Sequence, residues 1–316
     1  MKNIFQYLIL TFSFCINGYI CKSQPLTYSI NRDKIIHYKE LAKALKSPSS
    51  VYILSLSYFD SEELKTLSKL PSALEKKVEN IARFRNLKEL RLDYLPLTKL
   101  PIAIKGVTNI ETIILSRLDK LDWNQAFDVL CQMPNLKYLI IQDCKNLTIS
   151  TKTTCFSSLI NLRISSSPLI FTDTNPLCAP NLKEISLENN YKNMVYKGNW
   201  LLLSKVERVN ITSNPTLTLD SLFIALSSMK SLNELHISLN NYKTIPKFIY
   251  KLQNLSIIRI NELHLIGLPN TITRLTKLSE LNISSPNRIS IEYNILDSLK
   301  LSPMPNNPQI FKKRLH

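Results

Sequence analysis

Glycine is scarce in this chain, with four residues among 316. A loop that holds a phosphate group needs glycine, because the backbone must approach the ligand closely, and no glycine-rich loop of that kind is present. Cysteine and histidine are also few, at six and four, and they form neither a CxxC pair nor a cysteine–histidine cluster. We therefore expect no cofactor and no metal site.

Carboxylates are fewer than cations, with 24 Asp and Glu against 40 Lys and Arg, which gives a formal net charge of +16. A basic chain raises the question of nucleic-acid binding, and the answer depends on where the charges fall. Long apolar runs are absent after residue 23, so we expect no transmembrane segment in the mature chain.

What the chain does contain is one pattern repeated along its length. The segment NLKELRLDYLPLTKLP, residues 86–101, places leucines with neither the period of a strand nor that of a helix. Strings of the same form, LxxLxL with other apolar residues allowed, recur at intervals of 23 to 26 residues after a first interval of 36. They start at Val51, Leu87, Ile110, Leu136, Leu159, Leu182, Val206, Leu232, Leu255 and Leu278.

Each copy has apolar residues three and five positions after its start, as at Leu90 and Leu92. This alternation predicts a short strand with one side buried. One copy cannot bury its own apolar side, so the copies must stack around a shared core, with parallel strands on one wall. An asparagine directly precedes the start in five copies, at Asn86, Asn109, Asn135, Asn181 and Asn254.

These strings resemble the leucine-rich repeat family, in its bacterial-like form with Leu-Pro or Ile-Pro after the strand. Such pairs occur at 70–71, 100–101, 245–246 and 268–269. The resemblance covers about residues 51–290 and implies an α/β solenoid, a curved horseshoe of about ten repeats with the strands on its concave face. The family pattern expects Asn or Cys at the ninth position. Cys144, Asn190, Asn214 and Asn240 fit this pattern, whereas Leu95, Leu118, Leu263 and Pro286 do not, so less regular coils are expected there.

The two ends of the chain differ from the repeats. Residues 1–23 are typical of a secretory signal cleaved before Gln24, and an uncleaved membrane anchor is the less favoured alternative. Residues 24–50 contain an amphipathic pattern over 31–46, which predicts a helix that caps the N-terminal end of the core. The solenoid with its C-terminal cap then spans 51–298, and 299–316 are expected to be a polar tail. The predicted location is secreted, periplasmic or on the cell surface.

The third, fifth and seventh positions of each repeat should point away from the core, and we call the surface that they form the strand face. It carries six acids, Glu89, Asp93, Glu184, Glu188, Glu234 and Glu280, and four arginines, Arg91, Arg163, Arg208 and Arg259. Because this face is slightly acidic and the excess lysine lies elsewhere, we expect no nucleic-acid partner. Attraction to anionic cell-surface polymers through diffuse charge stays open.

Two cysteines, Cys155 and Cys178, each lie four residues before a repeat start, hence at matching depth on adjacent coils. They can be buried small hydrophobes, or they can form a disulfide, which an exported location permits. Glu234, His236 and Ser238 alternate along one strand and look superficially like a catalytic triad. Side chains two residues apart start about 6–7 Å apart by strand rise, so we expect a polar binding wall and not an enzyme.

The leading functional hypothesis is a non-enzymatic recognition module that binds a protein or peptide partner through the concave strand face, and the alternative is a surface or adhesion protein that binds glycans. Few aromatic side chains, mainly Tyr138, face outward on the strands, which favours protein. The binding residues should centre on an exposed apolar patch with arginine at its margin, the composition of an interface hot spot. The candidates are Ile114, Tyr138, Ile140, Arg91 and Arg163, followed by Arg208, Glu234, His236 and Arg259 in a more polar C-terminal half.

Overall fold

The computed structural model describes most of the chain from His37 onwards. By its internal contacts the chain divides into residues 1–35 and 36–316, and all described residues lie in the second part. They are 37–145, 147, 155–167, 170–171, 177–188, 195–196, 203–212, 219–238, 243–261, 264–284, 291, 293–304 and 307–313. The predicted signal segment 1–23, together with Asn190, Asn214 and Asn240, lies outside the described residues.

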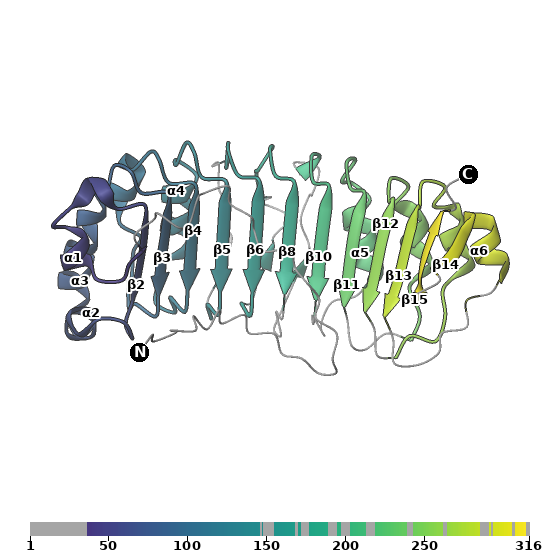
Figure 1. The fold of residues 1–316 in the computed structure, drawn as a ribbon, viewed down its shortest axis with the longest axis horizontal. Helices are drawn as coiled ribbons and strands as arrows, with labels where there is room; N and C mark the ends of the chain where they lie inside the picture. Colours follow the sequence, from purple (N-terminus) through teal and green to yellow (C-terminus); the bar gives the residue numbers. More distant parts are fainter. Residues whose placement is uncertain are drawn as a thin grey trace, which may run out of the picture. The chain divides into compact units, whose positions relative to one another are not determined.

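One sheet of 13 strands contains a strand from each of the ten repeats (Figure 1). Its order is β1-β2-β3-β4-β5-β6-β8-β10-β11-β12-β13-β15-β14, and pairing is parallel as far as β13 and antiparallel after it. The strands are β1 (His37–Tyr38), β2 (Ile53–Ser57), β3 (Glu89–Asp93), β4 (Thr112–Ser116), β5 (Tyr138–Gln142), β6 (Asn161–Ser165), β8 (Glu184–Glu188), β10 (Arg208–Thr212), β11 (Glu234–Ser238), β12 (Ile257–Asn261), β13 (Glu280–Ser284), β14 (Leu301–Met304) and β15 (Asn307–Lys313). The short strands β7 (Ile170–Phe171) and β9 (Val195–Tyr196) pair separately.

The register of the sheet follows the repeat. Leu90 of β3 lies opposite Leu54 of β2 and Ile113 of β4, and the same alignment continues to Leu281 of β13. The two apolar positions of each repeat strand are buried, and fully burying a leucine or isoleucine side chain contributes about 1.5–3 kcal/mol. The predicted leucine-rich repeat solenoid is confirmed by this register.

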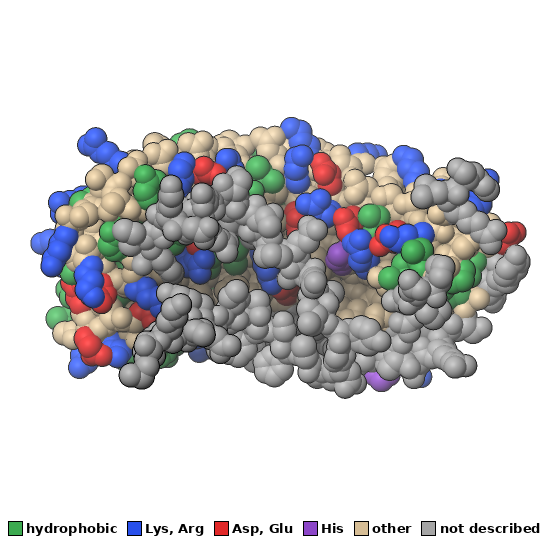
Figure 2. All heavy atoms as spheres, viewed as in Figure 1, with side chains coloured by type: hydrophobic (Ala, Val, Ile, Leu, Met, Phe, Trp, Pro, Cys, Tyr) green, Lys and Arg blue, Asp and Glu red, His purple; other side chains and the backbone are tan. Residues whose placement is uncertain are grey.

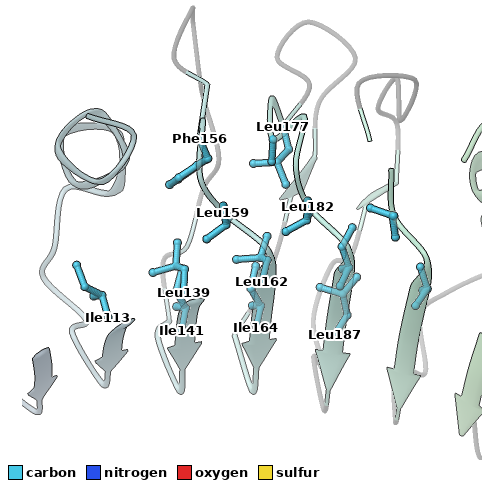
Figure 3. Close-up of a cluster of buried hydrophobic side chains, with 14 of the residues drawn as sticks. Ile113, Leu139, Ile141, Phe156, Leu159, Leu162, Ile164, Leu177, Leu182 and Leu187 are labelled. Atoms are coloured by element: carbon cyan, nitrogen blue, oxygen red, sulfur yellow. The ribbon is translucent and has the colours of Figure 1, made fainter. Parts of the chain in front are cut away.

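The core lies between the sheet and the helical segments, which we call the helical side (Figure 3). There Leu139 and Leu162 extend from the neighbouring strands β5 and β6. Phe156 and Leu177 lie on the segments that lead into β6 and β8, and they pack against the same core. Helices α4 and α5 lie behind the sheet in Figure 1. The helical segments are α1 (Leu41–Ala44), η2 (Pro48–Ser50), α2 (Glu62–Leu67), α3 (Pro71–Val78), η3 (Glu79–Arg83), η4 (Ile102–Gly106), α4 (Trp123–Leu130), α5 (Leu219–Leu226), η6 (Lys247–Lys251), η7 (Asn270–Arg274) and α6 (Tyr293–Leu299).

The Leu-Pro and Ile-Pro pairs mark where these segments begin. Pro71 is the first residue of α3, and Pro101, Pro246 and Pro269 directly precede η4, η6 and η7. Proline fixes φ near the helical value and has no N–H to leave unsatisfied in the first turn, so it favours a helical start at these positions.

Four consecutive turns after the strands share one geometry. A residue with φ between 50° and 54° follows the strand at Tyr94, Arg117, Asp143 and Ser166. Each donates its backbone N–H to the last residue of the next repeat's strand, as Tyr94 does to Ser116 at 2.9 Å. Leu95 and Leu118 are then buried in the core, as Cys144 is. The irregularity expected at these two leucines is therefore wrong, because the backbone closes the turn whatever the ninth side chain is.

The asparagines that precede the repeat starts tie neighbouring coils together. The Nδ2 group of Asn109 donates to the carbonyl oxygen of Arg85 at 2.7 Å, and that of Asn135 donates to Thr108 at 2.8 Å. Asn86, Asn181 and Asn254 make the equivalent bond to the preceding coil. Each side chain thus satisfies a carbonyl group that the coil itself leaves open.

The N-terminal end differs from the prediction of a helix over 31–46. Strand β1 occupies part of that range and pairs in parallel with β2, with Tyr38 opposite Leu54. Helix α1 is only four residues long, and its Leu41 and Ala44 are buried in the core. The open edge of β2 offers unpaired backbone groups, and the run IIHY, residues 35–38, is rich in residues that favour strands. These two influences override the helical periodicity.

The prediction of a polar tail over 299–316 is also wrong. Strand β15 pairs antiparallel with β13, and β14 pairs with β15. Phe311 is buried opposite Leu281, while the alternation of the strand places Lys312 on the strand face. The hairpin therefore covers the last repeat. Pro303 in the outer strand removes a backbone donor from the sheet edge, which limits further pairing.

Candidate binding surface

All nine predicted binding residues lie on the strand face. The fifth positions of neighbouring repeats are directly opposite one another, so a continuous row of side chains crosses the sheet. The row runs Arg91, Ile114, Ile140, Arg163, Ser186, Asn210, His236, Arg259. Tyr138, Arg208 and Glu234 lie in the parallel row of third positions.

The apolar part of this face is less exposed than predicted. Ile114 and Tyr138 are half-buried, but Ile140 is only 7% exposed. Ile140 lies directly between Ile114 and Arg163 in the register, and side chains opposite one another on neighbouring strands are close enough to cover each other. The prediction that Ile140 forms part of an exposed patch is therefore wrong. Ile114 and Tyr138 remain accessible.

The C-terminal half of the face is organised around Glu234 in β11. Its carboxylate accepts from the ring Nε2 of His236 at 2.9 Å and from the guanidinium of Arg259, which also reaches Glu280 at 3.2 Å. Lys312 of β15 completes the chain with a 3.0 Å contact to Glu280. The hydrogen bond from His236 and the charge of Arg259 outweigh the effect of burial and lower the pKa of Glu234 from 4.5 to about 2.

The middle of the face carries a second set of contacts. Arg163 donates to Glu188 at 2.6 Å, and the hydroxyl of Ser186 donates to the other oxygen of Glu188 at 2.7 Å. Arg208 pairs with Glu184 at 3.0 Å. The buried Nε of Arg163 has no hydrogen-bond partner among the described residues. The charged side chains here are held by partners on the next strand or two residues away.

Every acid predicted on this face has a cationic partner within the described chain. Glu89 pairs with Arg91, and Asp93 accepts two bonds from the guanidinium of Arg117 to its Oδ1 atom, at 3.0 and 2.8 Å. Two of these cations, Arg117 and Lys312, lie outside the positions counted from the sequence. Over the counted positions the acids outnumber the arginines, but each of these acids is held in an ion pair. In Figure 2 acidic and basic side chains accordingly lie close together along it.

One exposed cluster at the end of the strands was missed by the sequence reasoning. The rings of Tyr58, Phe59 and Tyr94 contact one another with centroid distances of 4.9 to 5.6 Å, and Arg117 lies 5.7 and 5.8 Å from the centroids of Tyr94 and Phe59. Phe59 is 56% exposed and Tyr94 46%. The signal was available, because Tyr58, Tyr94 and Arg117 share the eighth position of their repeats, which was not assigned to the face.

The triad-like residues do not assemble as a catalytic triad. Glu234 and His236 are in contact although they lie two residues apart on the strand. The separation of about 6–7 Å applies to the backbone, and these side chains are long enough to lean together. No hydrogen bond joins Ser238 to His236 in the described structure. The Nε2 atom of His236 contacts both Glu234 and Arg259, which places the ring inside the ion-pair network.

The cysteines separate into two kinds. Cys155 and Cys178 are joined as a disulfide, with their Cα atoms 4.6 Å apart on adjacent coils that form an isolated parallel bridge there. Cys131 and Cys144 are buried thiols, and burial raises the pKa of Cys144 to about 12. A thiol with that pKa is not a nucleophile or metal ligand near neutral pH. The described residues contain no group of three or more potential metal ligands.

Among the described residues, the helices are all too short or too polar to cross a membrane.

Comparison with known proteins found no matching family model and no matching curated protein. Many solved structures are similar, among them the following three. A leucine-rich repeat protein of Leptospira interrogans is 17% identical, with 84% of this chain and 97% of that chain covered and a TM-score of 0.27. The internalin InlF of Listeria monocytogenes is 14% identical, with 75% and 91% covered and a TM-score of 0.35. Internalin C2 of the same species is 15% identical, with 62% and 90% covered and a TM-score of 0.33. At these TM-scores the similarities carry no argument about ligands, and the fold assignment rests on the strand register.

Proposed function

We propose that the chain is a recognition module that binds a protein or peptide partner through the strand face, and that it is not an enzyme. The observation that carries the proposal is the frame of ion pairs around the uncharged side chains of Ile114 and Tyr138. Arg91 with Glu89 lies on one side of them, and Arg163 with Glu188 on the other. A partner therefore meets an apolar centre whose polar margin is already fixed.

This arrangement lowers the entropy that is lost on binding. Long charged side chains lose about 0.5–1.5 kcal/mol each when an interface immobilises them. Here Arg163, Arg208 and Arg259 are already held by carboxylates, so their ordering occurs during folding. Aromatic and aliphatic residues with arginine at the margin are also the composition enriched at protein interfaces.

The aromatic cluster of Tyr58, Phe59 and Tyr94 supports protein over a neutral glycan. A sugar ring stacks on an open, flat aromatic face, but these rings pack against one another at angles of 35° to 86°. Arg117 lies over two of them. Rings inclined to one another present edges as well as faces, which suits apolar side chains better than a stacked sugar ring.

We propose in addition that residues 1–23 direct export and that the protein acts outside the cytoplasm. The support is the sequence of this segment, with a lysine near its start, an apolar stretch and small residues before Gln24. The disulfide between Cys155 and Cys178 fits the same location, since disulfides persist in oxidising compartments.

The test replaces Tyr138 with alanine and compares binding to the partner identified by cross-linking and mass spectrometry of the wild-type protein. Loss of a hot-spot side chain costs about 1–3 kcal/mol, so affinity should fall by between about fivefold and about 150-fold. Tyr250→Ala is the matched control, because Tyr250 is a half-buried tyrosine on the helical side. Melting temperatures should stay nearly equal.

Two outcomes would contradict this placement. Normal binding by Tyr138→Ala, together with loss of binding by Arg208→Ala or Glu234→Ala, would move the site to the polar half of the face. Equal losses from Tyr138→Ala and Tyr250→Ala would mean that the strand face has no special part in binding.

A further inference from the structure

We propose that the helical side of the C-terminal repeats is a second binding surface, which takes a sulfated or carboxylated polysaccharide. The surface, which we call the basic patch, consists of Lys230, Lys247, Lys251, Arg274 and Lys277, and all five are exposed. It lies on the other side of the core from the strand face, so the proposal does not depend on the protein partner.

The first argument is that the positive charge here is not compensated. Apart from Arg259 of the strand face, residues 243–279 contain five lysines and arginines and one acid, Glu262, which lies outside the described residues. No ion pair involves any of the five cations of the basic patch within the described chain. The N-terminal helical segments differ, because Lys65 and Lys77 are paired there with Glu62 and Glu63.

The second argument is the linear arrangement. Lys230 follows α5, Lys247 and Lys251 lie on η6, and Arg274 and Lys277 lie on or just after η7, so three consecutive coils contribute to the basic patch. The coils are in direct contact, since the hydroxyl of Thr271 on η7 donates to the carbonyl of Lys247 at 2.8 Å. A row of cations that crosses successive coils suits a linear polyanion better than a small anion.

The third argument concerns the groups between the cations. Lys230 and Lys251 line the same hollow, together with the side chains of Ser227, Gln253 and Asn254. Lys277 reaches this hollow by donating to Oδ1 of Asn254 at 2.5 Å. The hydroxyl of Ser227 and the amides of Gln253 and Asn254 each donate one hydrogen bond to a backbone carbonyl. The hydroxyl oxygen and the second N–H of each amide are left to bind the hydroxyls and the anionic substituents of one sugar chain beside the ammonium groups.

The aromatic rings of the basic patch argue against single-stranded nucleic acid. The ammonium groups of Lys247 and Lys251 lie 5.8 and 5.6 Å from the centroid of the Phe248 ring, and Arg274 lies 5.1 Å from that of Tyr250. Bases stack on open aromatic faces, and here cations already occupy these faces. The same contacts hold the cations in place for a charged ligand.

The experiment measures heparin binding, as a sulfated polysaccharide probe, by the full chain with Lys247, Lys251 and Arg274 changed to glutamine. The control changes Lys46, Lys69 and Lys76 to glutamine, which removes the same charge from exposed residues of the N-terminal region. We expect the first variant to lose about tenfold or more in affinity and to show a shallower salt dependence. The control should lose less than about twofold, and Lys247→Arg with Lys251→Arg should bind at least as tightly as the wild type, because the positive charge is kept.

Several results would overturn the proposal. Equal losses in the two triple variants would assign binding to diffuse net charge. Equal or tighter binding of a DNA oligonucleotide would indicate a nucleic-acid surface, and preference for phosphatidylserine vesicles would indicate a membrane surface. Tyr138→Ala should bind heparin normally, so failure of the strand-face hypothesis and failure of this one are distinguishable. Circular dichroism of each variant checks that the fold is intact.

Discussion

Replacing Glu234 with glutamine removes the centre of the C-terminal ion-pair network while keeping the shape of the side chain. In the wild type this carboxylate accepts from His236 and Arg259, and its pKa is lowered from 4.5 to about 2. A difference of that size between the unfolded and folded chain corresponds to about 3 kcal/mol of stability at neutral pH. The side chain is 17% exposed, so solvent screens the interaction only in part.

The pH dependence follows from the direction of the shift. Because the folded state lowers the pKa of Glu234, the stabilisation is fully present above pH 4.5 and is lost as the pH falls towards 2. At pH 3 roughly half of it remains, since the folded protein still holds the carboxylate ionised while the unfolded chain is protonated. The variant cannot ionise at this position, so it lacks this stabilisation at every pH.

The measurement is urea unfolding of wild type and Glu234→Gln at several values between pH 3 and pH 7. The difference in unfolding free energy should be about 2–3 kcal/mol at pH 7 and should narrow towards pH 3. Glu207→Gln is the control. Glu207 pairs with Lys183 at 3.4 Å and is 37% exposed, and such pairs contribute less than about 1 kcal/mol. A difference for Glu234→Gln that does not change with pH would refute the reasoning.

The remaining predictions concern two kinds of link between coils and the position of the mature N-terminus. Cys155→Ser with Cys178→Ser should lower the unfolding free energy by about 3 kcal/mol, the loop-closure entropy for the separation of 23 residues, as measured by urea unfolding without reductant. In the exported wild-type protein, non-reducing peptide mapping should show these two peptides linked and an N-terminus at or near Gln24. Free thiols would count against the disulfide, and a full-length chain would count against the signal segment. Asn109→Ala should lower the unfolding free energy by about 0.5–1.5 kcal/mol, because it removes the hydrogen bond to the carbonyl of Arg85. Asn124→Ala, at an exposed position of α4, is the control and should lower it less. Equal losses would mean that the asparagine bond adds nothing to stability.

The repeat register could be predicted from the sequence because burial and backbone pairing specify it together. A slip by one residue would turn Leu90 and Leu92 out of the core and Arg91 into it, so only one alignment satisfies all ten copies. The same argument places every candidate binding residue on one face. It does not set how far each side chain is covered, which is why Ile140 is more buried than expected.

The features that sequence reasoning missed depend on contacts between distant parts of the chain. Strand β15 pairs with β13 because the last repeat leaves an open edge, and the proline-rich segment around it has no repeat signature. Glu280 is separated by 32 residues from Lys312, its partner across that pairing. Likewise, Arg117 reaches Asp93 of the preceding coil from the turn after its strand, where the backbone φ is positive.

The distribution of charge connects the two proposed surfaces. Each of the six acids counted on the strand face pairs with a cation, so this face contributes little to a net charge that is +14 once Lys2 and Lys22 leave with the predicted signal. A surface whose charges are already paired selects partners through its shape and through the positions of its polar groups, and it attracts polyanions weakly. The excess cations lie away from it, and the basic patch is where they gather with few acids nearby. A polyanion held on the helical side would therefore leave the strand face open, and one molecule could bind a polysaccharide and a protein partner at the same time.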